Sequence, residues 1–247
     1  MALSELHDRL RFVLVRTSHS GNIGSAARAI RTMGFDRLAL VAPRRFPDPE
    51  ATALAAGADD VLGQAAIHDD LVSGLTGTTF ALGLSARRRG VNLPELDPRE
   101  GAAQAVAAAR RGEQVALVFG NERTGLENDE LSRCHAMVRI PSVDDFSSLN
   151  LSQAVQVVAY ELRLALLAGE ARAPATDVDP DEVPADAEQL ERFFAHLGET
   201  LDDIEFHKGR SPTTIMLKLR KLFLRARPEL RELRILHGIL ADRKSVV

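Results

Sequence analysis

Short apolar runs alternate with longer amphipathic segments along this chain, up to about residue 168. The apolar runs are four or five residues long, as is typical of strands buried on both faces of a parallel sheet. They are Phe12–Val15, Leu38–Val41, Thr79–Leu82, Val115–Phe119 and Met137–Ile140. Helical spacing marks the segments Ile23–Met33, Pro49–Ala56, His68–Leu75, Pro98–Arg110 and Leu149–Leu167. The alternation predicts an α/β fold in which helices cover both faces of a mainly parallel sheet.

The composition changes after this region and predicts a separate C-terminal unit. Residues 169–185 are rich in Ala, Pro and Asp, which indicates a linker. Amphipathic segments beyond it predict helices at Ala187–Leu201, Pro212–Arg227 and Pro228–Leu240. We therefore expect a main domain at residues 1–168 and a helical extension at residues 186–247, which is too short to build much of a core by itself.

The C-terminal part also has an uneven distribution of charge, although the net charge of the whole chain is only −4. Residues 177–205 contain eleven acidic side chains and one basic side chain, whereas residues 207–247 contain eleven Lys or Arg and three acids. Such a basic segment is typical of a surface that binds a polyanion, but a solvated helix face balanced by its acidic neighbour has the same composition. Aromatic residues make up only 4% of the chain, so base stacking is not the expected main mode of binding.

Cysteine content and hydropathy indicate a cytoplasmic protein without a membrane partner. The single cysteine, Cys134, cannot form an internal disulfide or a cysteine-based zinc site, and no cluster of metal ligands is evident. The first residues lack the features of a signal peptide. No apolar run reaches the roughly 20 residues that are needed to span a bilayer.

Ligands bind at the carboxyl ends of strands in parallel α/β sheets, so the loops that follow strands are the candidate sites. The first such loop, Arg16–Arg28, contains Gly21 and Gly24, which allow close backbone approach at a helix N-terminus that could bind an anion. Its G-x-x-G spacing matches neither the dinucleotide fingerprint nor the P-loop. Tight helix packing is an alternative explanation for its small residues. Packing does not readily explain three polar residues: His19, Asn22 and Arg28.

The second loop, Phe119–Leu126, follows the longest of the apolar runs. Gly120 and Gly125 bracket a polar turn that presents Glu122 and Arg123 together. A salt-bridged turn is the alternative to a binding role.

Two further loops carry unusual residues. In Ile140–Ser152, either Ser147 or Ser148 is a plausible N-cap for a helix that begins near Leu149, but capping explains only one of the serines. The loop Gly83–Arg89 concentrates positive charge after a predicted strand.

Three of these loops together resemble the motifs of the SPOUT class of RNA methyltransferases, in the same order and with suitable spacing. The matching segments are Asn22-Ile-Gly-Ser-Ala-Ala-Arg28, Phe119-Gly-Asn-Glu-Arg-Thr-Gly-Leu126 and Ser147-Ser-Leu-Asn-Leu-Ser152. The resemblance extends to the TrmJ family of tRNA ribose methyltransferases, and it includes the C-terminal segments Lys218–Phe223 and Arg225–Glu229. It covers nearly the whole chain apart from the linker.

The resemblance implies a sheet domain whose C-terminal part forms a trefoil knot, and an active site completed by a second subunit of a homodimer. It implies S-adenosylmethionine as methyl donor and the ribose 2′-hydroxyl of the pyrimidine at position 32 of the tRNA anticodon loop as acceptor. The residues that would bind the donor are Leu84, Ser85, Ala86, Gly120, Ile140, Ser147, Ser148 and Leu149.

The resemblance also suggests roles for individual side chains. Arg28 is the catalytic residue that the motif indicates, but an arginine keeps its proton near neutral pH and is a poor general base. We therefore expect Arg28 to fix a phosphate and stabilise the developing alkoxide, while His19, a water or a substrate phosphate oxygen accepts the proton. Ser148 would orient the ribose or the donor. The expected RNA contacts are Arg87, Arg89, Lys218, Arg220 and Lys221.

Several alternatives stay open from the sequence. The chain could instead methylate rRNA or a guanosine ribose of tRNA, or it could be a knotted RNA-binding module without activity. The choice between cytidine and uridine is also open, as is a role for Glu122 and Arg123 at the donor site or in a dimer. Asn121 and Phe146 stand where some relatives have Arg and Tyr, so we assign neither a catalytic role.

Overall fold

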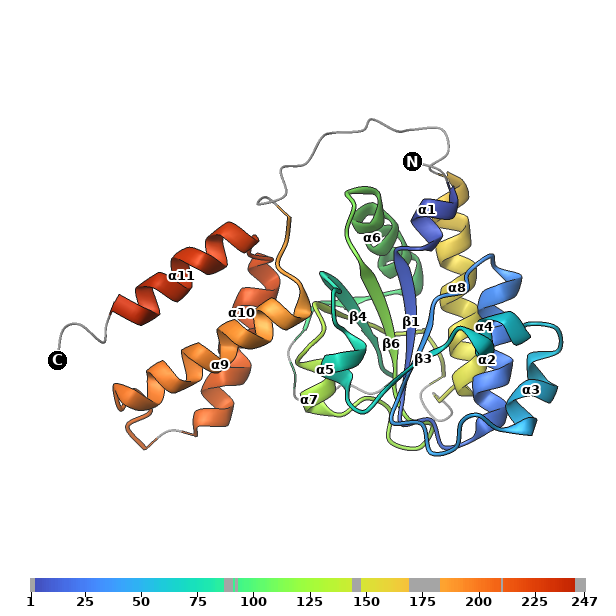
Figure 1. Cartoon of the computed structure of the whole chain (residues 1–247), viewed down its shortest axis with the longest axis horizontal. Helices are drawn as coiled ribbons and strands as arrows, with labels where there is room; N and C mark the ends of the chain where they lie inside the picture. Colours follow the sequence, from blue (N-terminus) through green and yellow to red (C-terminus); the bar gives the residue numbers. More distant parts are fainter. Residues whose placement is uncertain are drawn as a thin grey trace.

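The computed structural model describes residues 3–86, 91, 93–143, 148–168, 183–209 and 211–242, and it contains a seven-stranded sheet in the order β3-β2-β1-β6-β4-β7-β5 (Figure 1). Every strand pair in this sheet is parallel, as the sequence predicts. The strands are β1 (Leu10–Val15), β2 (Leu38–Val41), β3 (Ala66–His68), β4 (Phe80–Leu84), β5 (Glu95–Leu96), β6 (Val115–Phe119) and β7 (Ala136–Val138).

Helices cover both faces of the sheet because its central strands are apolar on both sides. In β1, Phe12 and Leu14 belong to one hydrophobic cluster, whereas Val13 and Val15 belong to the other. The first cluster is covered by α1 (Leu3–His7), α2 (Ser20–Thr32), α3 (Pro49–Ala55), α4 (Asp59–Gly63), α6 (Pro98–Arg110) and α8 (Leu151–Ala168). The second is covered by α5 (Leu71–Gly74) and α7 (Asn128–Leu131).

The prediction of a helix over His68–Leu75 is only partly right, because this segment contains the end of β3 and then the short helix α5. The Asp70 side chain accepts a hydrogen bond from the Ser73 N–H at 2.8 Å and so caps α5. The strands β3 and β5 are absent from the prediction. They have three and two residues, lie at the two edges of the sheet and contain no fully buried residue.

The N-cap predicted for α8 is wrong, because this helix begins at Leu151 and Asn150 caps it. The Asn150 Oδ1 accepts from the Ser152 N–H at 2.9 Å, and the Asn150 N–H donates to the Gln153 Oε1 at 3.3 Å. Ser148 precedes this cap by two residues, and Ser147 lies outside the described residues.

Helix α8 is also the one helix of the described chain that has the length and apolarity to cross a membrane. Core helices of ordinary domains meet the same two conditions. Its buried side chains, among them Val155, Val158 and Leu162, belong to the core cluster, and the helix packs against α2 and α6.

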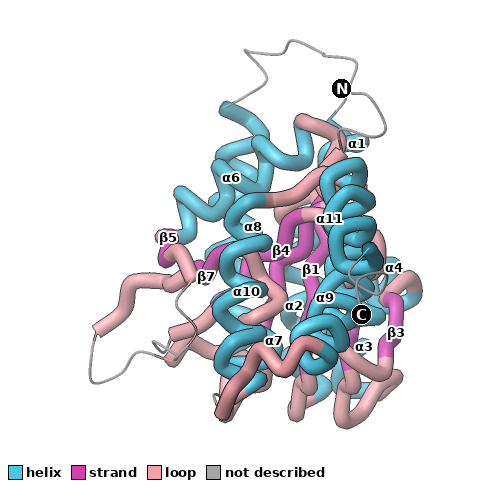
Figure 2. Tube along the Cα trace, turned by 90° about the vertical axis from the view of Figure 1, so that its left-hand side faces the viewer, coloured by secondary structure: helices cyan, strands magenta, loops and turns pink. Residues whose placement is uncertain are grey.

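Three C-terminal helices form a group beside the sheet: α9 (Ala187–Asp203), α10 (Pro212–Ala226) and α11 (Leu230–Asp242). They share a small core around Phe193 and Phe194, to which α10 and α11 contribute one fully buried residue each, Leu224 and Leu233. Figure 2, seen from this side, shows the three helices in front of the sheet. They join it near α5, where the Ala187 N–H donates to the Thr78 carbonyl at 2.7 Å.

The predicted trefoil knot depends on the path of the chain through the loops after β4 and β7. Residues 87–90, 92 and 144–147 of these loops, like most of the predicted linker at 169–182, lie outside the described residues. The knot and the domain boundaries therefore stay predictions.

Candidate active site

A pocket lies at the carboxyl edge of the sheet, where the loops after β4, β6 and β7 meet. It is open to solvent, and the empty space there, part of which is open solvent, is about 900 Å³. With the exception of Ser147, which is outside the described residues, every residue predicted to bind the methyl donor lines it: Leu84, Ser85, Ala86, Gly120, Ile140, Ser148 and Leu149. Sequence motifs that are far apart along the chain thus contribute to one cavity.

The wall contributed by the second loop requires a glycine at position 120. A Cβ atom on Gly120 would lie 2.2 Å from the Gly125 carbonyl carbon and the Leu126 nitrogen, because the loop turns back on itself there. The Gly125 N–H donates to the Asn121 carbonyl at 2.7 Å and closes this turn. The result is a pocket wall of bare backbone.

Asn121 joins this turn to the first loop. Its Nδ2 donates to the Arg16 carbonyl at 2.6 Å and to the Ser18 hydroxyl at 2.7 Å, while its Oδ1 accepts from the Arg123 N–H at 2.9 Å. No local pattern in the sequence indicates the partners of Asn121, which are about a hundred residues away along the chain. An arginine at this position could not make the same set of donor and acceptor contacts.

Glu122 is the anion that occupies the start of α2. Its carboxylate accepts from the Ser18 N–H at 2.8 Å, the His19 N–H at 3.1 Å and the Asn22 Nδ2 at 3.0 Å. Burial alone favours the neutral acid, but these hydrogen bonds together outweigh it and hold the pKa of Glu122 below its ordinary value. The predicted anion site at this helix start is therefore filled by a side chain of the chain itself, which also lines the pocket.

Asn22 and Asn150 complete a connection between the three motif loops. The Asn150 Nδ2 donates to the Asn22 Oδ1 at 3.0 Å, and Asn22 in turn donates to Glu122. One polar chain thus connects the N-cap of α8, the start of α2 and the turn after β6. We infer that displacement of any one loop would break hydrogen bonds that also position the other two.

The glycines of the first loop serve helix packing. A Cβ atom on Gly24 would lie 2.0 Å from the Ala51 carbonyl oxygen in α3, and one on Gly21 would lie 2.7 Å from the Leu54 side chain. The close approach that these glycines allow is therefore to helix α3.

The residues predicted to be catalytic are not all in one place. Ser148 lines the pocket, whereas Arg28 and His19 are exposed and are not among the lining residues. Arg28 lies on α2, and His19 is at the N-cap position of that helix but makes no capping bond with its side chain. Of the three, only Ser148 therefore lies in the pocket lining of a single chain.

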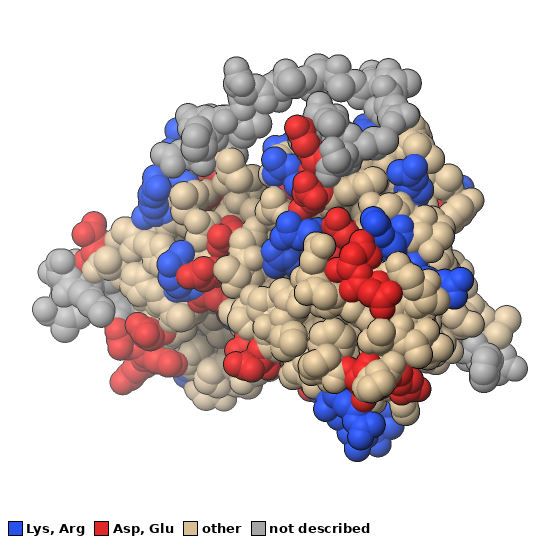
Figure 3. Space-filling model, turned by 45° about the vertical axis from the view of Figure 1, so that its right-hand side comes forward, with Lys and Arg blue, Asp and Glu red and all other residues tan. Residues whose placement is uncertain are grey.

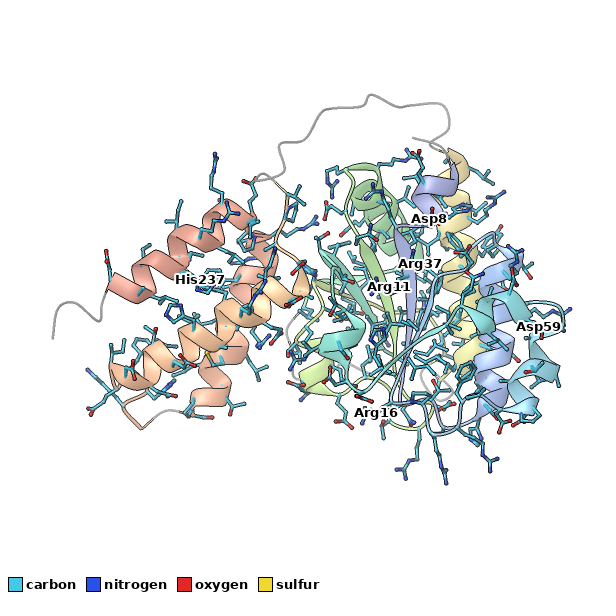
Figure 4. The ribbon with its side chains drawn as sticks, viewed as in Figure 1. Asp8, Arg11, Arg16, Arg37, Asp59 and His237 are labelled. Atoms are coloured by element: carbon cyan, nitrogen blue, oxygen red, sulfur yellow. The ribbon has the colours of Figure 1, made fainter. Side chains whose placement is uncertain are left out.

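Arg16 links the first loop to α7. Its guanidinium pairs with Glu127 at 2.6 Å and with Glu130 at 3.0 Å, at the lower end of the molecule in Figure 4. Burial alone lowers the pKa of Arg16, but the two carboxylates outweigh it and raise that pKa above its ordinary value. This residue has a backbone φ of 53°, a left-handed conformation that the ion pairs and the Asn121 contact hold in place.

The predicted RNA contacts in the C-terminal helices fall into two groups. Lys218 is exposed and Lys221 is half-buried, so both can face a partner. The guanidinium of Arg220 makes two bonds to Glu191, at 2.6 and 2.7 Å, and lies over the Phe194 ring. This geometry gives Arg220 a structural contact within the helices and does not support its predicted contact with RNA. Arg87 and Arg89 lie outside the described residues.

No group of three or more His, Cys, Asp or Glu side chains within the described ranges could hold a metal ion. The lone thiol is not among the residues that line the pocket. Cys134 is buried, and burial raises its pKa to about 12, which makes it a poor nucleophile.

Comparisons with known proteins agree with this geometry. The sequence profile of the SpoU rRNA Methylase family matches residues 9–160, and that of the tRNA methyltransferase TrmJ C-terminal domain matches residues 188–245. The tRNA (cytidine/uridine-2′-O-)-methyltransferase TrmJ of Salmonella typhimurium is 51% identical over 233 residues, which are 94% of this chain and 95% of that protein. The chain belongs to the TrmJ family of SpoU-type methylases.

Solved structures extend this result to the fold. TrmJ from Z. mobilis ZM4 has a TM-score of 0.82 and 33% sequence identity, with 95% of this chain and 98% of that chain covered. The SpoU methyltransferase AviRb from Streptomyces viridochromogenes, solved in complex with AdoMet, has a TM-score of 0.53 and 22% identity, covering 66% of this chain and 62% of that one. The likeness to AviRb therefore shows the fold alone. The TrmJ match includes the C-terminal helices as well as the sheet.

Proposed function

We propose that this chain transfers a methyl group from S-adenosylmethionine to the ribose 2′-hydroxyl of the pyrimidine at position 32 of the tRNA anticodon loop. The observation that carries the proposal is the pocket in which the second and third motif loops meet the loop after β4. The Salmonella relative is a tRNA (cytidine/uridine-2′-O-)-methyltransferase, which supports the reaction and the choice of tRNA. The position in the tRNA rests on the family resemblance. A reaction on tRNA also favours a cytoplasmic location.

The pocket suits an adenosine-containing donor. It is a concave site in which apolar side chains lie beside a few polar groups, as is usual for small-molecule sites. Apolar side chains such as Leu84, Ile140 and Leu149 can cover a purine, and the bare backbone near Gly120 leaves peptide groups accessible for hydrogen bonds. S-adenosylmethionine, when bound, supplies a methyl group on a sulfonium that is already a good leaving group.

The residues of the chain therefore need mainly to align the hydroxyl and to stabilise its developing charge. In our proposal Arg28 holds a phosphate next to the target ribose and stabilises the alkoxide. The proton passes to His19, to a water or to a phosphate oxygen of the substrate, and Ser148 orients the ribose or the donor. Arg28 is not the base, because a guanidinium retains its proton at the pH of the reaction.

We propose that the active form is a homodimer. Arg28 and His19 are exposed and outside the pocket lining, so the pocket of one subunit could receive them from the other. A candidate contact surface lies on α8, where Tyr160, Leu164 and Leu167 are 49%, 38% and 42% exposed. Their spacing of four and three residues puts them on one face of the helix. Burial of this face against a second copy would remove a row of apolar side chains from water.

The alternative with an observation in its favour is methylation of rRNA, since the family profile that matches the sheet domain is named for it. The match of the C-terminal helices to a tRNA methyltransferase domain favours tRNA. A panel of RNAs incubated with labelled S-adenosylmethionine tests the choice. We expect label on tRNA transcripts with cytidine or uridine at position 32, little on a transcript with guanosine there, and none on rRNA. Label on rRNA alone would contradict the proposed substrate while leaving the reaction type intact.

A further inference from the structure

A pair of adjacent arginines follows β2 and is not part of the motif loops. The loop 42–48 that carries Arg44 and Arg45 leaves the sheet at the same carboxyl edge as the loops of the pocket. Its backbone is held next to the first motif loop, because the Arg44 N–H donates to the Thr17 carbonyl at 3.1 Å. Thr17 precedes His19 by two residues, so the pair lies beside the proposed catalytic loop.

Both ends of this loop are fixed. At its start, Ala42 has a left-handed φ of 44°, and its N–H donates to the His68 carbonyl at 2.8 Å. At its end, Phe46 packs against the main core, and the Asp48 side chain caps α3 by accepting from the Glu50 N–H at 2.9 Å. The two arginines are therefore presented from a rigid backbone, which lowers the entropic cost of binding a partner.

The charge of this pair is available to a partner. Arg44 is exposed, and Arg45 is 75% exposed in its side chain with one contact, from its Nε to Asp48 at 3.5 Å. An exposed ion pair of that length contributes little. Three acids that follow β6 are already engaged, since Glu122 binds the start of α2 while Glu127 and Glu130 pair with Arg16. Figure 3 shows Lys and Arg side chains gathered at the lower end of the molecule, the end at which Figure 1 has the carboxyl ends of the strands.

We propose that Arg44 and Arg45 bind the phosphate backbone of the RNA strand that carries the target ribose. Arginine is suited to this partner because its planar guanidinium can donate two parallel hydrogen bonds to one phosphate. Contacts of this kind set the register of the strand on the protein without reading its sequence. The proposal rests on the proposed function, because it takes the substrate to be RNA that approaches the first motif loop.

The test is the salt dependence of tRNA binding by Arg44→Ala and Arg45→Ala. We expect each variant to bind tRNA more weakly and to reduce the slope of log affinity against log salt concentration by about 1. In the double variant the slope should be reduced by about 2. Lysine at both positions should keep most of the slope, because a point charge still contacts phosphate.

The matched control is Arg37→Ala. Arg37 is exposed and immediately precedes β2 (Figure 4). The substitution therefore removes one positive charge, as the loop variants do, but at the opposite end of the strand that leads to Arg44. We expect it to leave the slope unchanged. Binding of S-adenosylhomocysteine, measured by calorimetry, should be equal in all variants and thereby shows that each has folded.

Unchanged slopes in both loop variants, or a loss equal to that of Arg37→Ala, would overturn the proposal. A second outcome is that the wild-type protein binds and methylates a different RNA, with a salt-dependence slope that still depends on Arg44 and Arg45. That result would refute the choice of tRNA but keep the phosphate contact. A wild-type protein that binds no RNA would refute both.

Discussion

At the scale of single residues, Glu122 shows how a charged group in a binding loop can have a structural task. Its carboxylate holds two backbone N–H groups and one side-chain amide at the start of α2, and it lines the pocket as well. The sequence places Glu122 in a candidate site but does not indicate its partners. Those partners are about a hundred residues away in the sequence, where no periodic pattern connects them.

Replacement of Glu122 by Gln removes the anion and gives the site an amide group that cannot accept all three bonds. We expect the free energy of unfolding at pH 7 to fall by about 1–3 kcal/mol, the usual cost when hydrogen bonds to a charged group are lost. Urea denaturation measures this change in the free energy of unfolding. The control is Arg123→Gln in the same turn, whose exposed side chain should change stability by less than about 0.5 kcal/mol.

The same variant has a predictable dependence on pH. The pKa of Glu122 is depressed in the folded chain, so its stabilising contribution is complete above the unfolded pKa and is lost as pH falls through the lower folded value. The difference in stability between wild type and Glu122→Gln should therefore be largest near neutral pH and shrink in acid. A difference that stays constant or grows as pH falls would refute this role for the carboxylate.

At the scale of elements, the sequence predicted best what burial determines. Five strands lie close to their expected positions because burial on both faces requires a continuous apolar run, whereas the short edge strands β3 and β5 have no such run. The positions of the motif loops could be predicted because parallel strands share a carboxyl edge. The N-cap of α8 could not, because several polar residues precede the helix and only the observed hydrogen bonds distinguish Asn150 from them.

The contact between α2 and α3 belongs to this scale. Gly24→Ala would put a methyl group 2.0 Å from the Ala51 carbonyl oxygen, so the two helices would have to separate. We expect a loss of about 1–3 kcal/mol in thermal or urea unfolding. The control is Gly198→Ala within α9, where a Cβ meets nothing within 4 Å and should raise stability by about 0.5–1 kcal/mol. A Gly24→Ala protein as stable as wild type would contradict the packing interpretation.

At the scale of the whole molecule, ion pairs attach the C-terminal helices to the sheet domain. Glu191 on α9 pairs with Arg133 of the sheet domain and with Arg220 of α10, both at 2.6 Å, while Arg227 pairs with Glu113 and lies over the Phe80 ring. The sequence suggested a basic tail opposite an acidic segment, and part of that charge is in fact used internally. The sequence does not predict which arginines form these internal ion pairs, because the pairs depend on how the helices pack.

Glu191→Gln leaves Arg220 without its counterion and weakens the link to Arg133. We expect a loss of about 1–3 kcal/mol in urea unfolding, less than for a fully buried pair because all three groups are partly exposed. The control, Glu188→Gln, removes a carboxylate that is 52% exposed and pairs with Arg192 at 3.5 Å within α9. Its effect should stay below about 0.5 kcal/mol. Equal losses in the two variants would refute a special role for Glu191.

The most direct test of the central claim compares two tRNA transcripts that differ by one oxygen. One carries the natural ribose at nucleotide 32 and the other a 2′-deoxyribose there, and both are incubated with labelled S-adenosylmethionine before the modified nucleotide is mapped by mass spectrometry. We predict one methyl group on the 2′-oxygen of nucleotide 32 in the first transcript and none in the second. Equal methylation of the deoxy transcript, on a base or at another nucleotide, would contradict the proposed reaction.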